Sequence, residues 1–171
     1  MNGLDVRSTS RRVCEVSGHD VITRFYEAFA RRDGDTMASC YADDVDFCDP
    51  AFGQLHGERA RDMWRMLCRA GKDLEVRASG IEASDDRGRA HWEADYTFSA
   101  TGRRVHNVVD ARFVLRDGLI VEHIDTFDFG AWAGQAFGPV GSVLGKTPVL
   151  PFVMRRLANR QLDGFRKRRA G

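Results

Sequence analysis

The spacing of apolar residues in this chain changes near its middle, and that change limits the fold more than any other feature. Residues 18–32 and 57–70 place apolar side chains at intervals of three and four, which is typical of helices that bury one face. A short helix at residues 37–41 and a brief strand at residues 45–49 are predicted between them, and Pro50 closes the strand. Helices therefore occupy most of the first half.

The second half of the chain has the pattern of strands. β-branched and aromatic residues alternate with polar ones, and Asp-Arg-Gly, Thr-Gly and Asp-Gly turns separate the segments. Helices followed by an antiparallel meander predict an α+β domain, in which N-terminal helices pack on a curved, mainly antiparallel sheet. A dinucleotide-binding βαβ unit has no place in this order. The predicted strands are residues 74–83, 90–99, 105–115 and 119–128.

Length and composition set the class of protein. With 171 residues, 43% of them hydrophobic and 30% charged, the chain predicts one globular domain with a short extension. No apolar run approaches the ~18 residues of a membrane span, and the N-terminus is too polar for a signal peptide. We therefore expect a cytoplasmic protein without membrane insertion. The four cysteines form no CxxC pair, which favours reduced thiols over a zinc or redox motif.

Charge divides the chain into an acidic body and a basic tail. Residues 146–171 hold eight basic residues and one acid, whereas residues 1–145 hold 18 basic and 24 acidic residues. We expect residues 1–17 to be flexible, and residues 131–171 to form an extension of the domain at 18–130. In the extension, residues 133–151 are predicted to be irregular because they are rich in Gly and Pro.

A basic helix is predicted over residues 152–168, with Val153, Leu157 and Phe165 facing the body. The helix either lies near the mouth of the fold as a lid or covers the outer sheet face. A basic amphipathic helix on a membrane, nucleic acid or protein surface is the other interpretation. Because the folded domain has no basic stripe, we expect no nucleic-acid partner.

The hairpin turns predict which residues lie opposite one another. A two-residue Asp117-Gly118 turn would pair Arg112 with His123 and Asp110 with Asp125, which places two carboxylates face to face. A two-residue Thr101-Gly102 turn would likewise place Glu93 beside Asp110 and Thr97 beside His106. At such a separation two ionised carboxylates repel, so Asp110 and Asp125 would share a proton as an acid and base pair.

These pairings sort the sheet into a polar face and an apolar face. Two interpretations follow: the apolar face packs on the helices and the charged face is solvated, or the charged face lines a pocket and the apolar face is covered by a second chain. The polar face would hold Glu93, Asp95, Thr97, His106, Asp110, Arg112, His123 and Asp125. The apolar face would hold Trp92, Tyr96, Phe98, Val109, Phe113, Leu115, Ile120 and Ile124.

Two stretches resemble a known superfamily. FYEAFARRDGDTMASCYADDVDFCDPAFG at residues 25–53 and DGLIVEHIDTFD at residues 117–128 are similar to the nuclear transport factor two-like superfamily, in particular to its SnoaL-like polyketide cyclases and ketosteroid isomerases. The resemblance covers roughly residues 18–130. It implies a cone-shaped sheet whose helices enclose an internal pocket for a small apolar molecule. The superfamily hosts isomerases, cyclases, dehydratases, hydrolases and plain binders.

The resemblance assigns roles to individual residues. Asp49 matches the general base of ketosteroid isomerases, and Asp110 matches their protonated oxyanion-hole aspartic acid. Asp125 matches the acid/base aspartate of SnoaL-like cyclases. The sequence departs from the isomerases at Phe25, where they carry the oxyanion-hole tyrosine, and Tyr26 lies about 100° round the helix.

We therefore expect a cofactor-independent enzyme that moves protons on a small apolar carbonyl-like molecule. The alternative is a non-catalytic ligand-binding or interaction domain on the same fold. Arg112 and His123 either position a substrate oxygen or neutralise the acids, and His106 beside Thr97 fits a simple polar pair equally well. No metal or cofactor is expected, and the superfamily habit is a dimer through the outer sheet face. The predicted catalytic residues are Asp49, Asp110, His123 and Asp125, and the predicted substrate-binding residues are Phe25, Tyr26, Trp64, Thr97, His106 and Arg112.

Overall fold

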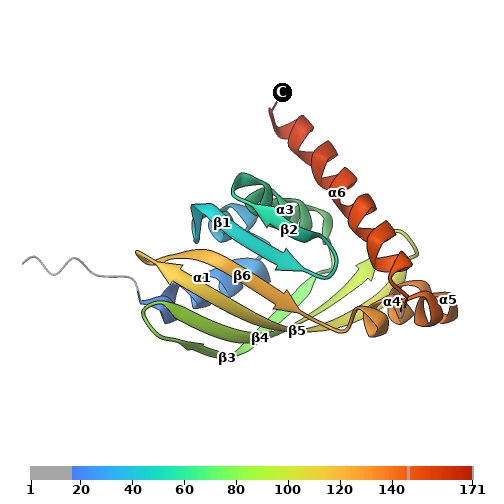
Figure 1. Cartoon of the computed structure of the whole chain (residues 1–171), viewed down its shortest axis with the longest axis horizontal. Helices are drawn as coiled ribbons and strands as arrows, with labels where there is room; N and C mark the ends of the chain where they lie inside the picture. The colour runs from blue at the N-terminus through green and yellow to red at the C-terminus, as the bar shows by residue number, and fades with distance from the viewer. Residues whose placement is uncertain (1–16, 146, 171) are drawn as a thin grey trace, which may run out of the picture.

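A computed structural model describes residues 17–145 and 147–170, and the predicted α+β class is confirmed. Helices α1 to α3 accompany the first two strands, four strands follow, and three helices complete the chain (Figure 1). The elements are α1 (Gly18–Ala30), α2 (Gly34–Ser39), β1 (Tyr41–Asp49), β2 (Gly53–His56), α3 (Glu58–Ala70), β3 (Glu75–Ala83), β4 (Arg87–Phe98), β5 (Arg103–Arg116), β6 (Leu119–Thr126), α4 (Phe129–Phe137), α5 (Pro139–Leu144) and α6 (Val149–Ala170).

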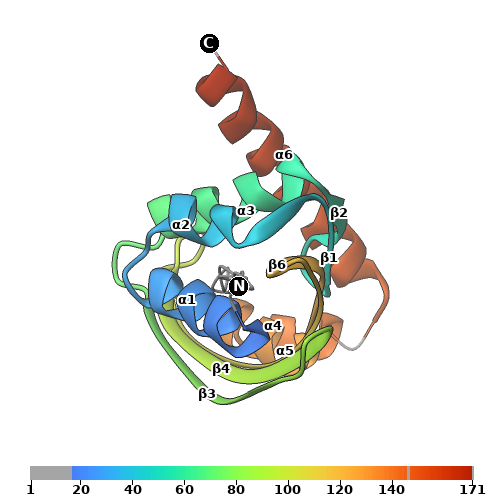
Figure 2. The same ribbon diagram turned by 90° about the vertical axis from the view of Figure 1, so that its left-hand side faces the viewer.

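The six strands form one curved, unclosed sheet in the order β2-β1-β6-β5-β4-β3. All neighbours are antiparallel except β1 and β6, which run parallel. Figure 2 shows the sheet curving around α1, with α2 and α3 on the remaining side. The sheet and helices therefore enclose a cone, as predicted, and the apolar stripe of α1 is buried inside it through Val21, Ile22 and Phe25.

A bulge in β6 overturns the predicted pairing of Asp110 with Asp125. Next to the turn, Arg116 lies opposite Leu119 as expected, but the register shifts by one residue between Leu115 and Val114. Beyond the shift, Asp110 lies opposite Thr126, and Asp125 lies opposite Ala111. One extra residue in a strand moves every later side chain to the other face, so Asp110 and Asp125 point to opposite sides of the sheet.

The connection between β4 and β5 is longer than the predicted two-residue turn. Phe98 lies opposite Arg103, so four residues form the loop, and His91 rather than Glu93 lies beside Asp110. Asp95 lies opposite His106, the position predicted for Thr97. The register differs by two residues, which changes the partners but leaves each side chain on its predicted face.

The apolar face of the sheet is the inner one, which contradicts a pocket lined by the charged face. Trp92, Val109 and Phe113 are each at most 7% exposed and pack against the helices. The charged side chains of β4 and β5 lie outside, where they form ion pairs such as Arg77 with Asp95. The exposed apolar patch on which a dimer through the outer face was predicted is therefore absent from the described residues.

Residues 133–151 are mainly helical, which corrects the predicted irregular segment. The glycines allow two helices to approach closely rather than loosening the chain. A Cβ atom on Gly141 would lie 1.9 Å from the Ala133 carbonyl oxygen, and one on Gly134 would lie 2.7 Å from Ser142 Oγ. Pro139 occupies the first turn of α5, where a missing N–H costs nothing.

The final helix forms as predicted but presents a different face to the body. Leu162 and Phe165 are buried, whereas Val153 and Leu157 are exposed, contrary to the prediction. Asp62 of α3 lies between Arg166 and Arg169, and its side chain is 5% exposed. Charge thus holds the C-terminal half of α6 on the body.

The structure also bears on the predictions for the N-terminal segment, the cysteines and membrane spans. The segment 1–17, predicted to be flexible, lies outside the described residues except for Ser17, whose side chain accepts a hydrogen bond from Asp20 N at the start of α1. Cys40, Cys48 and Cys68 are free thiols. None of the described helices is both long enough and apolar enough to cross a membrane.

Candidate functional site

A line of buried polar groups crosses the interior of the cone. The Trp64 indole Nε1 donates to the Tyr41 hydroxyl at 2.7 Å, and that hydroxyl lies 2.7 Å from His123 Nδ1. His123 Nε2 lies 2.9 Å from Asp125 Oδ1, and Trp92 Nε1 donates to the same oxygen at 3.3 Å. Four elements, α3, β1, β4 and β6, thus supply one connected network.

The donors and acceptors fix the proton on the histidine. An indole N–H can only donate, so the Tyr41 oxygen accepts from Trp64 and its own proton points to His123 Nδ1. The proton of a neutral imidazole then sits on Nε2 and is donated to Asp125, which also accepts from Trp92. This tautomer satisfies every group in the network, and the side chains of His123 and Asp125 are 0% and 3% exposed.

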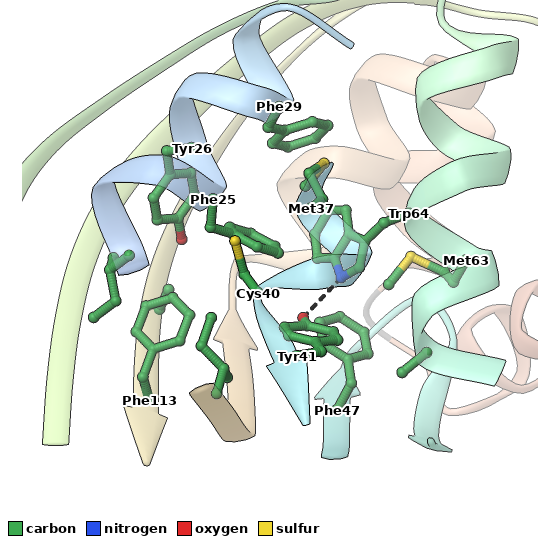
Figure 3. Packing of buried hydrophobic residues seen from close by; sticks show 14 of the residues in the cluster. Phe25, Tyr26, Phe29, Met37, Cys40, Tyr41, Phe47, Met63, Trp64 and Phe113 are labelled. Carbon is green, nitrogen blue, oxygen red and sulfur yellow. Dashed lines mark hydrogen bonds between the residues drawn. The ribbon is translucent and has the colours of Figure 1, made fainter. Parts of the chain in front are cut away.

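Aromatic rings surround the network. The Phe113 ring centroid lies 4.3 Å from that of His123, and the Trp64 ring stacks on the same imidazole at 5.9 Å. Phe25 packs edge-on to Trp64 and nearly parallel to Tyr41. Figure 3 shows these rings filling the space between α1, α3 and the sheet, with the hydrogen bond from Trp64 to Tyr41 drawn as a dashed line. The low polarity of this packing strengthens the interactions within the network.

Asp49 is the second carboxyl group of the interior. It ends β1 on the same side as Val45 and Phe47, because strand residues two apart share a face. Burial raises the pKa of the Asp49 carboxyl to about 7; the negative charge of Asp125 raises it as well, and the backbone N–H of Phe52 opposes the rise. The interior therefore holds the carboxyl groups of Asp49 and Asp125, whereas the predicted pair is Asp110 and Asp125.

Tyr26 contributes an unpaired donor. Its side chain is buried, and its hydroxyl has no hydrogen-bond partner among the described residues. Burial, and then the nearby charge of Asp125, raise the pKa of this phenol well above its ordinary value, so the hydroxyl keeps its proton. A buried donor without an acceptor is costly, and a ligand oxygen in this position would satisfy it.

Helices from the C-terminal extension cover the end of the cone near Asp49. The Trp132 indole of α4 donates to the Tyr96 hydroxyl at 2.8 Å. Burial, and to a smaller extent the charge of Asp49, raise the pKa of Tyr96. From α6, Arg155 donates to the Pro50 carbonyl and Asn159 to the Phe52 carbonyl. Of the two predicted positions for the extension, these contacts place it at the mouth.

The described residues leave Tyr26, His123 and Asp125 at most 5% exposed, whereas the resemblance implies an internal pocket that admits a ligand. Two hollows of about 430 and 330 Å³ lie instead along β3 to β5, lined by residues such as Arg89 and Arg112. Large rings from α1 and α3 fill the space where a ligand would bind, and the extension covers the mouth. A ligand reaches His123 and Asp125 only when these side chains or helices move.

The ten predicted site residues fall into two groups in the structure. Inside the cone lie Phe25, Tyr26, Asp49, Trp64, His123 and Asp125. On the outer face lie Asp110, which hydrogen bonds to His91, and His106, which hydrogen bonds to Asp95. Thr97, bonded to Asp73, and the exposed Arg112 lie there as well. These four do not contribute to the interior site.

Three interior residues are missing from the sequence prediction. The apolar pattern places Tyr41 in a helix, although it begins a strand. It places Trp92 and Tyr96 on the apolar face, which only the interpretation with a charged pocket turns outward. The indole of Trp92 carries the signal that could have located the site, because a buried Trp N–H needs an acceptor on its own face. Asp125 is that acceptor.

The described part of the chain offers no cluster of metal ligands. Within residues 17–145 and 147–170, no group of three or more His, Cys, Asp or Glu side chains is placed to hold a metal ion. The absence of a metal or cofactor from the reaction stays a prediction.

The fold agrees with a family comparison. The family model of the SnoaL-like domain matches residues 22–123. The chain belongs to the SnoaL-like family. This result confirms the resemblance, since the match spans α1 to β6 and includes His123. None of the curated proteins compared matches the sequence.

Solved structures share the SnoaL-like fold at low sequence identity. An LEH-like epoxide hydrolase of M. tuberculosis is 23% identical, with a TM-score of 0.58, over 72% of this chain and 92% of that chain. A putative polyketide cyclase of Xanthomonas campestris is 23% identical, with a TM-score of 0.57, over 68% and 93%. A protein of ketosteroid isomerase-like fold from Catenulispora acidiphila, in complex with trimethylamine, is 13% identical, with a TM-score of 0.61, over 70% and 94%.

Proposed function

We propose that this SnoaL-like protein is a cofactor-independent enzyme that transfers protons on a small apolar molecule bearing a carbonyl or similar oxygen. The reaction is of the isomerase, cyclase or dehydratase type. The observation that carries the proposal is the pair of interior carboxyl groups: Asp49 has a pKa of about 7, and Asp125 is held by His123 and Trp92. A group that titrates near neutral pH can accept a proton in one step and return it in the next.

Each interior group has a role in this scheme. Asp49 removes a proton from the carbon next to the substrate carbonyl, and the negative charge moves to the carbonyl oxygen. The Tyr26 hydroxyl donates a hydrogen bond to that oxygen, which stabilises the enolate. Asp49 then returns the proton to a different carbon for isomerisation. The network of Tyr41 and His123 holds the Asp125 carboxyl in a fixed orientation.

Some structural neighbours that share this fold are described as hydrolases or cyclases. One is described as an LEH-like epoxide hydrolase, and another as a putative polyketide cyclase. A third is described as an epoxide hydrolase/cyclase-like enzyme in pyran ring formation. Their low sequence identity transfers the fold only, so the substrate class proposed here rests on the interior side chains.

A non-catalytic ligand-binding or interaction domain is the second candidate. The closed interior favours it, because His123 and Asp125 have almost no contact with solvent. An enzyme must open to admit substrate, whereas a structural domain has no such need. A homodimer and a cytoplasmic location stay predictions from the sequence.

Proton exchange in D₂O tests the proposal even though the natural substrate is unidentified. The protein is incubated with a panel of apolar ketones, including β,γ-unsaturated ones, and deuterium incorporation next to the carbonyl is followed by NMR. We expect exchange above the buffer rate for at least one ketone. Replacing Asp49 by Asn should lower that rate by ~10² or more, because the amide cannot carry the proton.

Asp110→Asn is the matched control, since this carboxyl lies on the outer face beside His91. Its exchange rate should equal that of the wild type. Equal rates for Asp49→Asn and the wild type would remove Asp49 from the mechanism. Ketone binding, detected by calorimetry, with no exchange across the panel would favour the ligand-binding domain.

A further inference from the structure

One face of α6 is exposed from its start to its end, and its first half is apolar. Val149, Phe152, Val153 and Leu157 are 63%, 60%, 42% and 46% exposed. Their spacing of three and four places them on one side of the helix, opposite the buried Leu162 and Phe165. Figure 2 shows this helix projecting beyond the sheet and α3.

Exposed apolar residues are concentrated in this part of the molecule. Of nine large hydrophobic side chains that are exposed in the described residues, seven belong to α5 and α6. The three in α5 are Val140, Val143 and Leu144, and α5 lies at the base of α6 (Figure 1). So many exposed apolar side chains in one region of a protein mark an interaction surface.

Basic side chains continue the same face of α6. Arg156, Arg160 and Lys167 follow Val149 and Val153 at helical spacing, and all three are exposed. None of the three forms a salt bridge with a described residue. Of the nearby acids, Asp62 pairs with Arg166 and Arg169, which face the body. Asp163, the one acid of α6, pairs with Arg59 of α3. The exposed face is therefore apolar and carries a positive net charge.

We propose that this face of α5 and α6 docks on the surface of an anionic lipid bilayer. Phe152 and Leu157 enter the region between headgroups and acyl chains, while Arg156, Arg160 and Lys167 bind the lipid phosphates. This combination of exposed apolar side chains and cations on one helix face is the pattern of helices that lie in the membrane interface. The helix carries too many charges to cross the bilayer, so it lies parallel to the surface.

Charge distinguishes this partner from two others. A second copy joined about a two-fold axis would bring the same basic side chains together, which repel. A nucleic acid would accept the arginines, but it offers no apolar region for Val149, Val153 and Leu157, which cannot stack on bases as aromatic rings do. An anionic bilayer matches both halves of the face.

Vesicle co-sedimentation of the full-length protein tests the proposal. Vesicles of phosphatidylcholine alone are compared with vesicles that also contain phosphatidylglycerol. We expect sedimentation with the mixed vesicles, weaker binding to phosphatidylcholine alone, and loss of the difference in ~1 M NaCl, where charges are screened beyond ~3 Å.

Variants assign the binding to the exposed face. The double variant Phe152→Ser and Leu157→Ser should lower partitioning about tenfold or more. Arg156→Gln and Arg160→Gln should each lower it about fivefold. Val108→Ser is the control, because Val108 is 45% exposed on the outer sheet face and far from α6 in sequence. All variants should keep the wild-type melting temperature, since the replaced side chains are exposed.

Three outcomes would overturn the proposal. The first is equal sedimentation with both vesicle types, and the second is unchanged binding by the Phe152→Ser and Leu157→Ser variant. In the third, the protein does not bind vesicles but binds another partner. Either light scattering reports a dimer that dissociates in this variant, or the protein binds a labelled oligonucleotide. The third outcome would assign the face to a second copy or to a nucleic acid.

Discussion

At the scale of single residues, two tyrosines of the same core differ in what their hydroxyl groups contact. The Tyr41 hydroxyl joins Trp64 to His123, whereas the Tyr26 hydroxyl has no partner among the described residues. Tyr41→Phe should therefore lower the free energy of unfolding by ~1–3 kcal/mol, because it leaves two buried polar nitrogens without a partner. Urea unfolding measures this change.

Tyr26→Phe is the matched variant and should leave stability unchanged or raise it slightly. It removes a buried polar group that gains nothing in the absence of ligand. Equal losses for both variants would show that the two hydroxyl groups are similarly bonded.

The raised pKa of the Asp49 carboxyl predicts how this group's contribution to stability depends on pH. Folding raises its pKa from an ordinary value of 3.8 to about 7, so the folded state favours the protonated form. The stability that this group contributes is then fully present below pH ~4 and is lost as the pH rises from ~4 to ~7. Asp49→Asn is neutral throughout, so it should match the wild type near pH 4 and exceed it by on the order of 4 kcal/mol near pH 8.

Unfolding free energies measured across this range test the prediction, with the exposed Asp85→Asn as control. A constant difference between Asp49→Asn and the wild type at every pH would contradict a raised pKa.

The sequence locates some interior residues and misplaces others for a local reason. Alternation with Val45 and Phe47 correctly places Asp49 on the inward side of its strand. The predicted pairing of Asp110 with Asp125 is wrong because it depends on an unbroken ladder between β5 and β6. A single-residue bulge leaves no clear mark in composition, yet it carries Asp125 to the inner face while Asp110 stays outside.

At the scale of elements, two glycines in helices of the extension have opposite roles. A Cβ at Gly141 would collide with the backbone of α4, whereas at Gly164 in α6 the nearest atom is Arg168 Nη1 at 3.5 Å. Gly141→Ala should separate α5 from α4 and lower the melting temperature by several degrees. Gly164→Ala should raise helix stability by about 0.5–1 kcal/mol. Thermal unfolding followed by circular dichroism compares them, and a rise for Gly141→Ala would contradict the close contact.

The helices differ in how well the sequence predicts them. Long periodic segments such as α1, α3 and α6 are recognisable from their apolar spacing, because burial of one face fixes that spacing. The helices α4 and α5 are not, since Gly and Pro also mark irregular chain, and only the approach of a neighbouring helix distinguishes the two uses. The face of α6 that contacts the body is likewise decided by Asp62, on an element distant in sequence.

At the scale of the whole molecule, α6 joins the extension to the SnoaL-like body. Deleting residues 146–171 removes the burial of Leu162 and Phe165 and leaves the buried Asp62 with Arg65 as its basic partner. We expect a loss of roughly 3–6 kcal/mol in unfolding free energy and a lower melting temperature, because two large side chains lose their contacts. The double variant Arg166→Gln and Arg169→Gln should reproduce part of the loss, whereas Arg156→Gln and Arg160→Gln remove equal charge from the exposed face and should not. An unchanged melting temperature with rapid proteolysis of the intact extension would show that α6 is detached from the body.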